Sequence, residues 1–356
     1  MPVRRARIIF ILLALSAAAA AQPKPLYDAT PAELRELAAL KPLAKPHYTW
    51  PIHPTHLDRR TTSLWLEDLI RITRTATIDE EAMDRRRVAA LVRICRDHGA
   101  TLGLKMSPWH SLPYVKDRDP TVRGKPEAEA ATRVLTRLTE FRRLVDEANR
   151  SLGAQVRVAV ILYDTEVFEL KKPTDPGAEA WNTAMRIKYN AAYDLAKRVF
   201  PDAYVDWYGR GWMRFFAIER TTGWGRSTWF DLTEKGDGAS AVLYRMPMIE
   251  DSIECFHRTV ADAREHGISK VTPWLGLGCG YHPDDGKKTV SYYEDWRYPP
   301  QVAARFGFEV NRRWAQAPHA NFYPGPGQNP YWFKHFIAYC RGAAAEKLED
   351  IPEVGE

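Results

Sequence analysis

The sequence predicts a (β/α)8 barrel in a single domain that spans residues 47–348. Eight segments with extended patterns alternate with helical patterns, which is typical of a parallel sheet with crossover helices. No break in composition divides the domain, and the run 156–168 is apolar enough for a strand buried on both faces. A doubly wound open sheet is the alternative, because it shows the same alternation.

Residues 1–21 have the pattern of a secretory signal peptide. Three arginines precede the apolar run 8–15, and the alanines at 19–21 provide a small-x-small cleavage site. A membrane anchor is the weaker interpretation, because the apolar run is too short to cross a bilayer comfortably. We therefore expect a secreted or periplasmic protein with no membrane span after cleavage.

The composition argues against a nucleic-acid partner. The net charge of +6 includes the three arginines of the signal peptide, so the mature chain carries +3. The remaining chain, roughly 335 residues, can bury a core without covalent support. Four cysteines with no C-x-x-C pair leave both a disulfide and buried free thiols open.

Residues 22–46 are expected to pack as an arm on the outside of the barrel. Thr30 is placed to cap a short helix, with Pro31 at the first helical position and Glu33 at the third. The first strand is predicted at 47–53.

The second strand is predicted at 63–73. Its apolar side chains are Leu64, Leu66, Leu69 and Ile70. Asp79 is then expected to cap a helix that Gly99 ends. The apolar stripe of this helix consists of Val88, Leu91, Val92 and Cys95.

The remaining elements alternate regularly up to an acidic tail at 349–356. Strands are expected at 100–106, 156–168, 203–207, 239–244, 269–275 and 319–323, and helices at 127–152, 178–200, 251–266, 300–316 and 330–347.

Acidic and aromatic residues, with two histidines and an arginine among them, recur at the ends of the predicted strands, which meet at one face of a barrel. They are Trp109 and His110 after the third strand, Asp164 and Glu166 after the fourth, Asp206, Tyr208 and Arg210 at the fifth, Tyr244 at the sixth, and Trp274, Tyr281, His282 and Asp284 at the seventh. Aromatic rings stack on the C–H faces of a pyranose, and glycosidic cleavage needs a protonated carboxyl and a second charge. This pattern predicts a carbohydrate substrate or ligand.

Glu166 is the candidate general acid. Asp164 lies two residues before it at a partly buried strand end, so desolvation and like-charge repulsion would raise the pKa of Glu166. Asp206, or an acid of the loop after the seventh strand, is the candidate second carboxylate. The walls of the site would be Trp109, Tyr208, Tyr244, Trp274 and Tyr281, and we expect no metal or organic cofactor.

The Asp164-Thr-Glu166 spacing resembles the Asp-x-Glu ending of barrel glycoside hydrolases of the chitinase-like and muramidase-like kind. The resemblance implies that Glu166 is the acid and that Asp164 orients the substrate or its neighbour. Tyr244 and Trp274 stand where such enzymes also carry aromatics. The repeated-aspartate motif of the chitinase-like group is absent, since Ile161-Leu-Tyr stands before Asp164.

A second comparison is with the large retaining clan, which has its acid after strand four and its nucleophile after strand seven. No glutamate follows strand seven here, so Asp284 or Asp285 would have to substitute. This difference leaves the mechanism open.

Two other functions remain as alternatives. A metal-dependent hydrolase would use the histidines of the first strand region and of other strand ends, namely His53, His56, His110 and His282, together with Asp58. Their spacing differs from the His-x-His of amidohydrolase barrels. A non-catalytic barrel that binds a glycan or a cell-surface partner through the same aromatic mouth is the stronger alternative.

Overall fold

The computed structural model describes residues 28–49, 52, 54–58, 63–106, 126–164, 176–208, 235–242, 256–257, 259–261, 263–264, 267–276, 317–323 and 332–342. The predicted signal peptide, the predicted helix at 300–316 and the acidic tail lie outside these residues.

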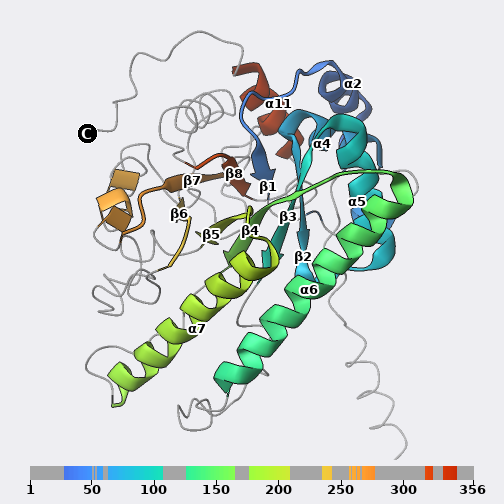
Figure 1. Cartoon of the computed structure of the whole chain (residues 1–356). Helices are drawn as coiled ribbons and strands as arrows, with labels where there is room; N and C mark the ends of the chain where they lie inside the picture. The colour runs from blue at the N-terminus through green and yellow to red at the C-terminus, as the bar shows by residue number, and fades with distance from the viewer. Residues whose placement is uncertain are drawn as a thin grey trace, which may run out of the picture.

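Eight parallel strands form a nearly closed barrel (Figure 1). They are β1 (His47–Thr49), β2 (Thr75–Asp79), β3 (Thr101–Met106), β4 (Val158–Asp164), β5 (Tyr204–Tyr208), β6 (Gly238–Val242), β7 (Val271–Gly276) and β8 (Ala320–Tyr323). Hydrogen-bonded neighbours follow the order β1-β8-β7-β6-β5-β4-β3-β2. A doubly wound sheet would reverse its order at a switch point, so the predicted barrel is confirmed.

β1 and β2, the two ends of this order, also meet. The hydroxyl of Thr75 donates a hydrogen bond to the carbonyl of His47, and the N–H of Ile52 donates to the carbonyl of Thr77 at 3.0 Å. These two bonds join the edges of the sheet beside the seven regular ladders.

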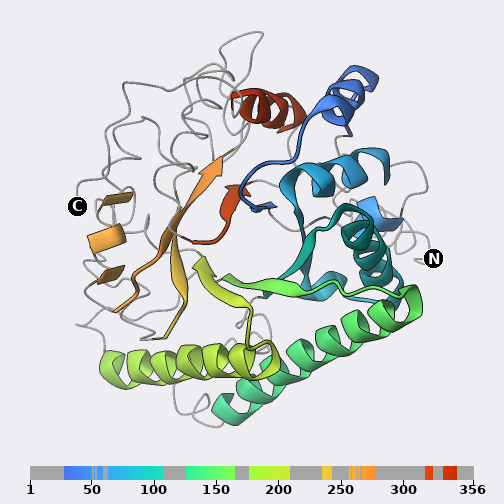
Figure 2. The same cartoon turned by 45° about the horizontal axis from the view of Figure 1, so that its top comes forward.

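The helices surround the sheet, as Figure 2 shows for α4, α5, α6, α7 and α11. The helices of the described part are α2 (Pro31–Ala39), α3 (Pro54–Asp58), α4 (Ser63–Thr73), η1 (Glu80–Ala82), α5 (Arg85–His98), α6 (Pro126–Leu152), α7 (Ala178–Val199) and α11 (Trp332–Gly342). α6 packs between α5 and α7 along one side of the barrel. None of the described helices has the length and apolar character of a membrane span.

The outward-facing side of β4 and β5 packs against α7. The rings of Tyr163 and Trp207 stack with their centroids 4.8 Å apart, and the hydroxyl of Tyr163 donates to the carbonyl of Ala192 at 2.8 Å. Because side chains alternate along a strand, the neighbouring residues Asp164 and Asp206 face the barrel interior.

The prediction of a strand at 63–73 is wrong, because this segment is the helix α4. Trp65, Leu66, Leu69 and Ile70 are buried at spacings of three and four residues, whereas Leu64 is 66% exposed. The second strand is instead β2, whose sequence Thr-Ala-Thr-Ile-Asp contains few large apolar residues. Its threonines are buried nonetheless, and Thr75 forms one of the two hydrogen bonds that join the edges of the sheet.

The predicted cap at Asp79 is also corrected. Asp79 caps the short η1 by accepting a hydrogen bond from the N–H of Glu81, and Asp84 caps α5 by accepting from the N–H of Arg87 at 2.8 Å. The predicted end of α5 is confirmed, since Gly99 has a φ of 62°.

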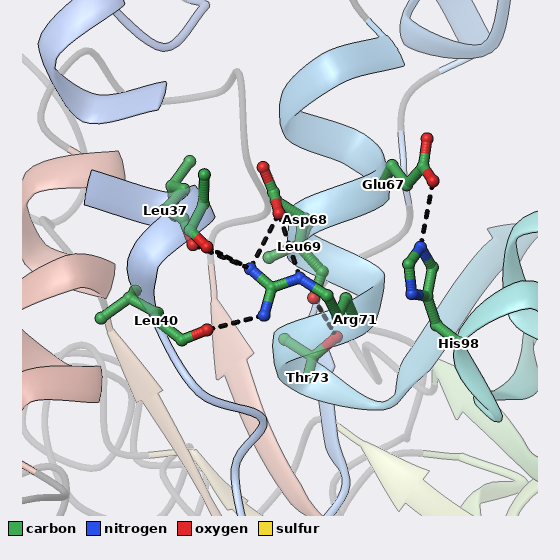
Figure 3. Close-up of polar contacts among 9 residues, drawn as sticks. Leu37, Leu40, Glu67, Asp68, Leu69, Arg71, Thr73 and His98 are labelled. Atoms are coloured by element: carbon green, nitrogen blue, oxygen red, sulfur yellow. Dashed lines mark hydrogen bonds and ion pairs between the residues drawn. The ribbon is translucent and has the colours of Figure 1, made fainter. Parts of the chain in front are cut away.

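The capping box of α2 is confirmed, and the far end of this helix is held by α4. Thr30 accepts from the N–H of Glu33, whose carboxylate accepts from the N–H of Thr30. At the other end, the guanidinium of Arg71 donates to the carbonyls of Leu40 at 2.6 Å and Leu37 at 2.9 Å (Figure 3). α2 is therefore fastened to the outer layer of helices.

Of the cysteines, Cys95 and Cys340 are buried free thiols. Burial raises the pKa of both thiols, which makes them unreactive. Cys255 and Cys279 lie outside the described residues.

Candidate functional site

Four of the predicted site residues fall within the described ranges: Asp164, Asp206, Tyr208 and Trp274. The others lie outside them, namely Glu166, Trp109, His110, Arg210, Tyr244, Tyr281, His282 and Asp284. The described part of the barrel therefore contains two of the three proposed catalytic carboxylates.

Asp164 is the last residue of β4 and forms an ion pair with a lysine on the neighbouring strand β3. The Nζ of Lys105 on β3 lies 3.2 Å from Asp164 Oδ2 and 3.0 Å from Asp79 Oδ2 at the end of β2. We call these three residues the mouth trio. Their side chains are 11%, 12% and 27% exposed for Asp164, Lys105 and Asp79, so they are largely buried but open to solvent.

The lysine of the mouth trio is held in its charged form. Burial acts to lower the pKa of Lys105, but the negative charges of Asp164 and Asp79 outweigh it, and the pKa is raised above its ordinary value. The ammonium also offsets part of the negative charge of Asp164. Lys105 therefore reduces the like-charge repulsion that Asp164 would exert on a neighbouring carboxylate.

Asp206 lies deeper, at the centre of a polar group that we call the interior cluster: Asp206, Ser240, His319 and Asn321. Its Oδ2 accepts from the hydroxyl of Ser240 at 2.8 Å and from the Nδ2 of Asn321 at 3.3 Å, and His319 Nε2 lies at 3.4 Å. Its Oδ1 accepts no hydrogen bond from any residue that the structure describes. Asp206 is 0% exposed.

Aromatic rings enclose the interior cluster from the side of the strand beginnings. The rings of Tyr48 and Tyr204 meet the ring of His319 edge-on, with centroid distances of 4.8 and 5.0 Å. Burial, followed by the negative charge of Asp206, raises the pKa of Tyr204. In this arrangement Asp206 contacts β6 and β8 rather than the solvent at the mouth, and its catalytic role stays a prediction.

The two described aromatics differ in their neighbours. Tyr208 ends β5 and is the ladder partner of Asp164, which places its backbone beside the mouth trio. Trp274 on β7 is the ladder partner of Asn321 and is 1% exposed. A ring that stacks on a sugar needs an accessible face, whereas the ring of Trp274 is buried inside the barrel. Its role as a wall of the site stays a prediction.

Sequence reasoning missed the partners of the two carboxylates. From the sequence, Asp79 is expected only as a helix cap, and Lys105 lies within the strand predicted at 100–106 with no role of its own. The available signal was a charged residue one position before the end of a buried strand, since a lysine there requires a partner. Asn321 within β8 gives a related signal, because a buried amide also requires hydrogen-bond partners.

The histidine alternative finds no support in the described part. His56 is buried against the ring of Trp65 at 4.8 Å, whereas Asp58 pairs with Arg86 and Arg87 on the surface. Among the described residues, no group of three or more metal-ligating side chains could hold an ion. His53, His110 and His282 lie outside those residues.

No protein-family model matches the chain, and no curated protein matches it significantly. Solved structures do. The GH53 catalytic domain of Ignisphaera aggregans matches with a TM-score of 0.50 and 11% identity, over 85% of this chain and 99% of that domain.

Two further matches are a thermostable mutant of a xylanase from Cellvibrio japonicus and a family 39 glycoside hydrolase from Bacteroides cellulosilyticus WH2. The first has a TM-score of 0.46 and 11% identity, over 87% of this chain and 99% of that one. The second has a TM-score of 0.46 and 12% identity, over 84% of this chain and 63% of that one. At such identities the likeness concerns the fold alone.

Proposed function

We propose that this barrel, whose fold is shared with glycoside hydrolases, cleaves a glycosidic bond in a carbohydrate. The observation that carries the proposal is the mouth trio, which places Asp164 and Asp79 at the carboxyl ends of barrel strands, where the active sites of such barrels lie. The fold shared with the GH53 catalytic domain supports a carbohydrate as the ligand.

Glu166 is the proposed general acid, two residues beyond Asp164 along the chain. It would protonate the departing glycosidic oxygen while a second carboxylate acts on the opposite face of the sugar. Asp206 has no exposed surface from which to contact a sugar. We therefore assign the second carboxylate to the loop after β7, at Asp284 or Asp285.

The test compares the wild type with Glu166→Gln on a panel of polysaccharides, measuring reducing ends and binding separately. We expect turnover to fall at least about 100-fold with binding retained, because the amide cannot donate the proton that assists departure. Glu140→Gln on α6, where Glu140 pairs with Arg137, is the matched control. Unchanged turnover in Glu166→Gln would remove Glu166 from the mechanism.

The second candidate is a barrel that binds a glycan without cleaving it. The sealed position of Asp206 favours it, because one of the carboxylates predicted from the sequence is then lost to the site. Binding without turnover in both the wild type and Glu166→Gln would establish this function instead.

We also propose that the protein is exported, on the pattern of residues 1–21. Expression of the whole chain in a bacterial host, followed by mass spectrometry of the mature protein, tests this. Export predicts a product outside the cytoplasm that begins at Gln22, whereas an intact N-terminus in the cytoplasm contradicts it.

A further inference from the structure

The mouth trio lies where the inward-facing side of the sheet meets the mouth. On β3, Thr101 lies within 3.4 Å of the Tyr48 hydroxyl, and a Cβ on Gly103 would lie 2.9 Å from Tyr48 Cε1, so alternate residues of this strand face the interior. Lys105 continues this face toward the end of the strand. Asp79 is its ladder partner on β2, and Asp164 ends β4.

The trio brings together the two kinds of group that a sugar hydroxyl can use. An ammonium donates hydrogen bonds and carboxylates accept them, whereas a hydroxyl does both. A hydroxyl at the trio can therefore accept from Lys105 while it donates to Asp79 or Asp164. Hydrogen bonds to charged groups are the stronger ones, and the partial exposure of the trio lets a ligand reach it.

The charges of the trio also favour one class of sugar over another. Within the trio itself, two carboxylates share one ammonium, so the carboxylates of Asp79 and Asp164 outnumber the cation of Lys105. A sugar that carries its own carboxylate would meet these carboxylates at close range. A neutral sugar meets no such repulsion.

We propose that Asp79, Lys105 and Asp164 form a subsite that binds neighbouring hydroxyls of a neutral sugar ring and rejects uronic acids. This inference rests on the proposed function and names the substrate class. Asp79 and Lys105 are then specificity-determining residues that touch the substrate.

An ion pair at the opposite end of the barrel provides the matched control. The Nζ of Lys197 on α7 lies 3.0 Å from Asp237 Oδ2, just before β6. Asp237 also accepts from the hydroxyl of Tyr193 and the N–H of Val205, which makes it a structural tie. Lys197→Met therefore removes a comparable ion pair without touching the mouth.

The experiment measures binding by calorimetry in a Glu166→Gln background, so that no probe is consumed. The probes are cellopentaose, xylopentaose, mannopentaose and pentagalacturonate, and circular dichroism verifies that every variant is folded. We expect at least one neutral pentaose to bind about tenfold or more tightly than pentagalacturonate. Adding Lys105→Met should weaken the binding of that pentaose about tenfold. Adding Asp79→Asn should weaken it as well and should also reduce the difference in affinity between the neutral pentaose and pentagalacturonate.

Two further variants separate binding from folding. Lys105→Arg keeps a cation and should retain most of the binding, and Lys197→Met should retain all of it. If folded Lys105→Met and Asp79→Asn bind the neutral pentaose as tightly as the background protein, the subsite is overturned while the proposed function stands. The subsite is also overturned if the background protein binds pentagalacturonate more tightly than every neutral pentaose. If no glycan binds at all, the proposed function and the subsite fail together.

Discussion

The interior cluster and the mouth trio each contain a carboxylate on the inner face of the barrel, but the two carboxylates have different partners. Asp206 is fully buried and is held by the hydroxyl of Ser240 and the amide of Asn321, with His319 nearby. Asp164 keeps a small exposed surface and is held by the ammonium of Lys105. The two carboxylates lie on adjacent strands, yet their surroundings differ in charge and in access to solvent.

The difference follows from the position of each carboxylate along its strand. Inside the barrel, Asp206 Oδ2 accepts hydrogen bonds from residues of β6 and β8, and these bonds tie both strands to β5. At the mouth, a charged partner and residual exposure keep the groups reachable. The end of a strand, rather than the presence of an acid within it, therefore marks the candidate site.

The largest expected effect comes from Asp206→Ala. The change leaves Ser240, Asn321 and His319 without their shared acceptor in the core, which should lower the free energy of unfolding by about 3 to 5 kcal/mol. Urea denaturation measures this. Asp206→Asn keeps one acceptor and should cost less. A loss below about 1 kcal/mol for Asp206→Ala would show that the interior cluster is not a structural tie.

On the outer side of the sheet, burial determines the charge of the imidazole of His47. His47 donates from Nδ1 to the carbonyl of Lys45 and accepts at Nε2 from the hydroxyl of Tyr339. Burial lowers the pKa of His47 from 6.5 to about 3. The native protein therefore holds this ring neutral.

The unfolded chain binds a proton at His47 below pH 6.5 that the native protein does not. Stability should thus fall as the pH falls, by about 2 kcal/mol from this group between pH 6.5 and about pH 4.5. Urea midpoints of the wild type and His47→Gln across this range measure the effect, and the variant should lack this component. Parallel pH dependence in the two proteins would contradict it.

The smallest expected effect is that of Lys105→Met on stability. The trio is largely buried but open to solvent, so loss of its ammonium should cost about 1 to 2 kcal/mol near neutral pH, between the values for exposed and for fully buried ion pairs. Because the pKa of Lys105 is raised in the native protein, its contribution is complete below its ordinary pKa of 10.5 and is lost as the pH rises above that value. The difference between wild type and variant should therefore shrink only above pH 10.5, as urea midpoints would show.

Much of the fold was predictable because it depends on local signals. The capping box at Thr30, the glycine end of α5 and the apolar strand β4 each lie within a few residues of sequence. The segment 63–73 was misassigned because its leucines also suit a strand, and only their burial at helical spacing distinguishes the two. β2 was missed because its threonines look polar until the barrel buries them.

The candidate site was predictable in part. A sequence pattern selected Asp164 as an acid at a strand end, and the structure places it there. The pattern could not reveal Lys105 or Asp79 as its neighbours, because they lie on other strands and meet it only through the register of β2, β3 and β4.

By itself, the sequence determined the class of fold and placed an acid at the end of β4. Both depend on hydrophobic periodicity and helix caps, which are properties of neighbouring residues. Only the tertiary structure decided that Asp206 is sealed inside the barrel while Asp164 stays within reach of solvent. Burial and charge pairing arise between strands far apart in the chain, and two aspartates that look alike in sequence acquire different surroundings when the barrel closes.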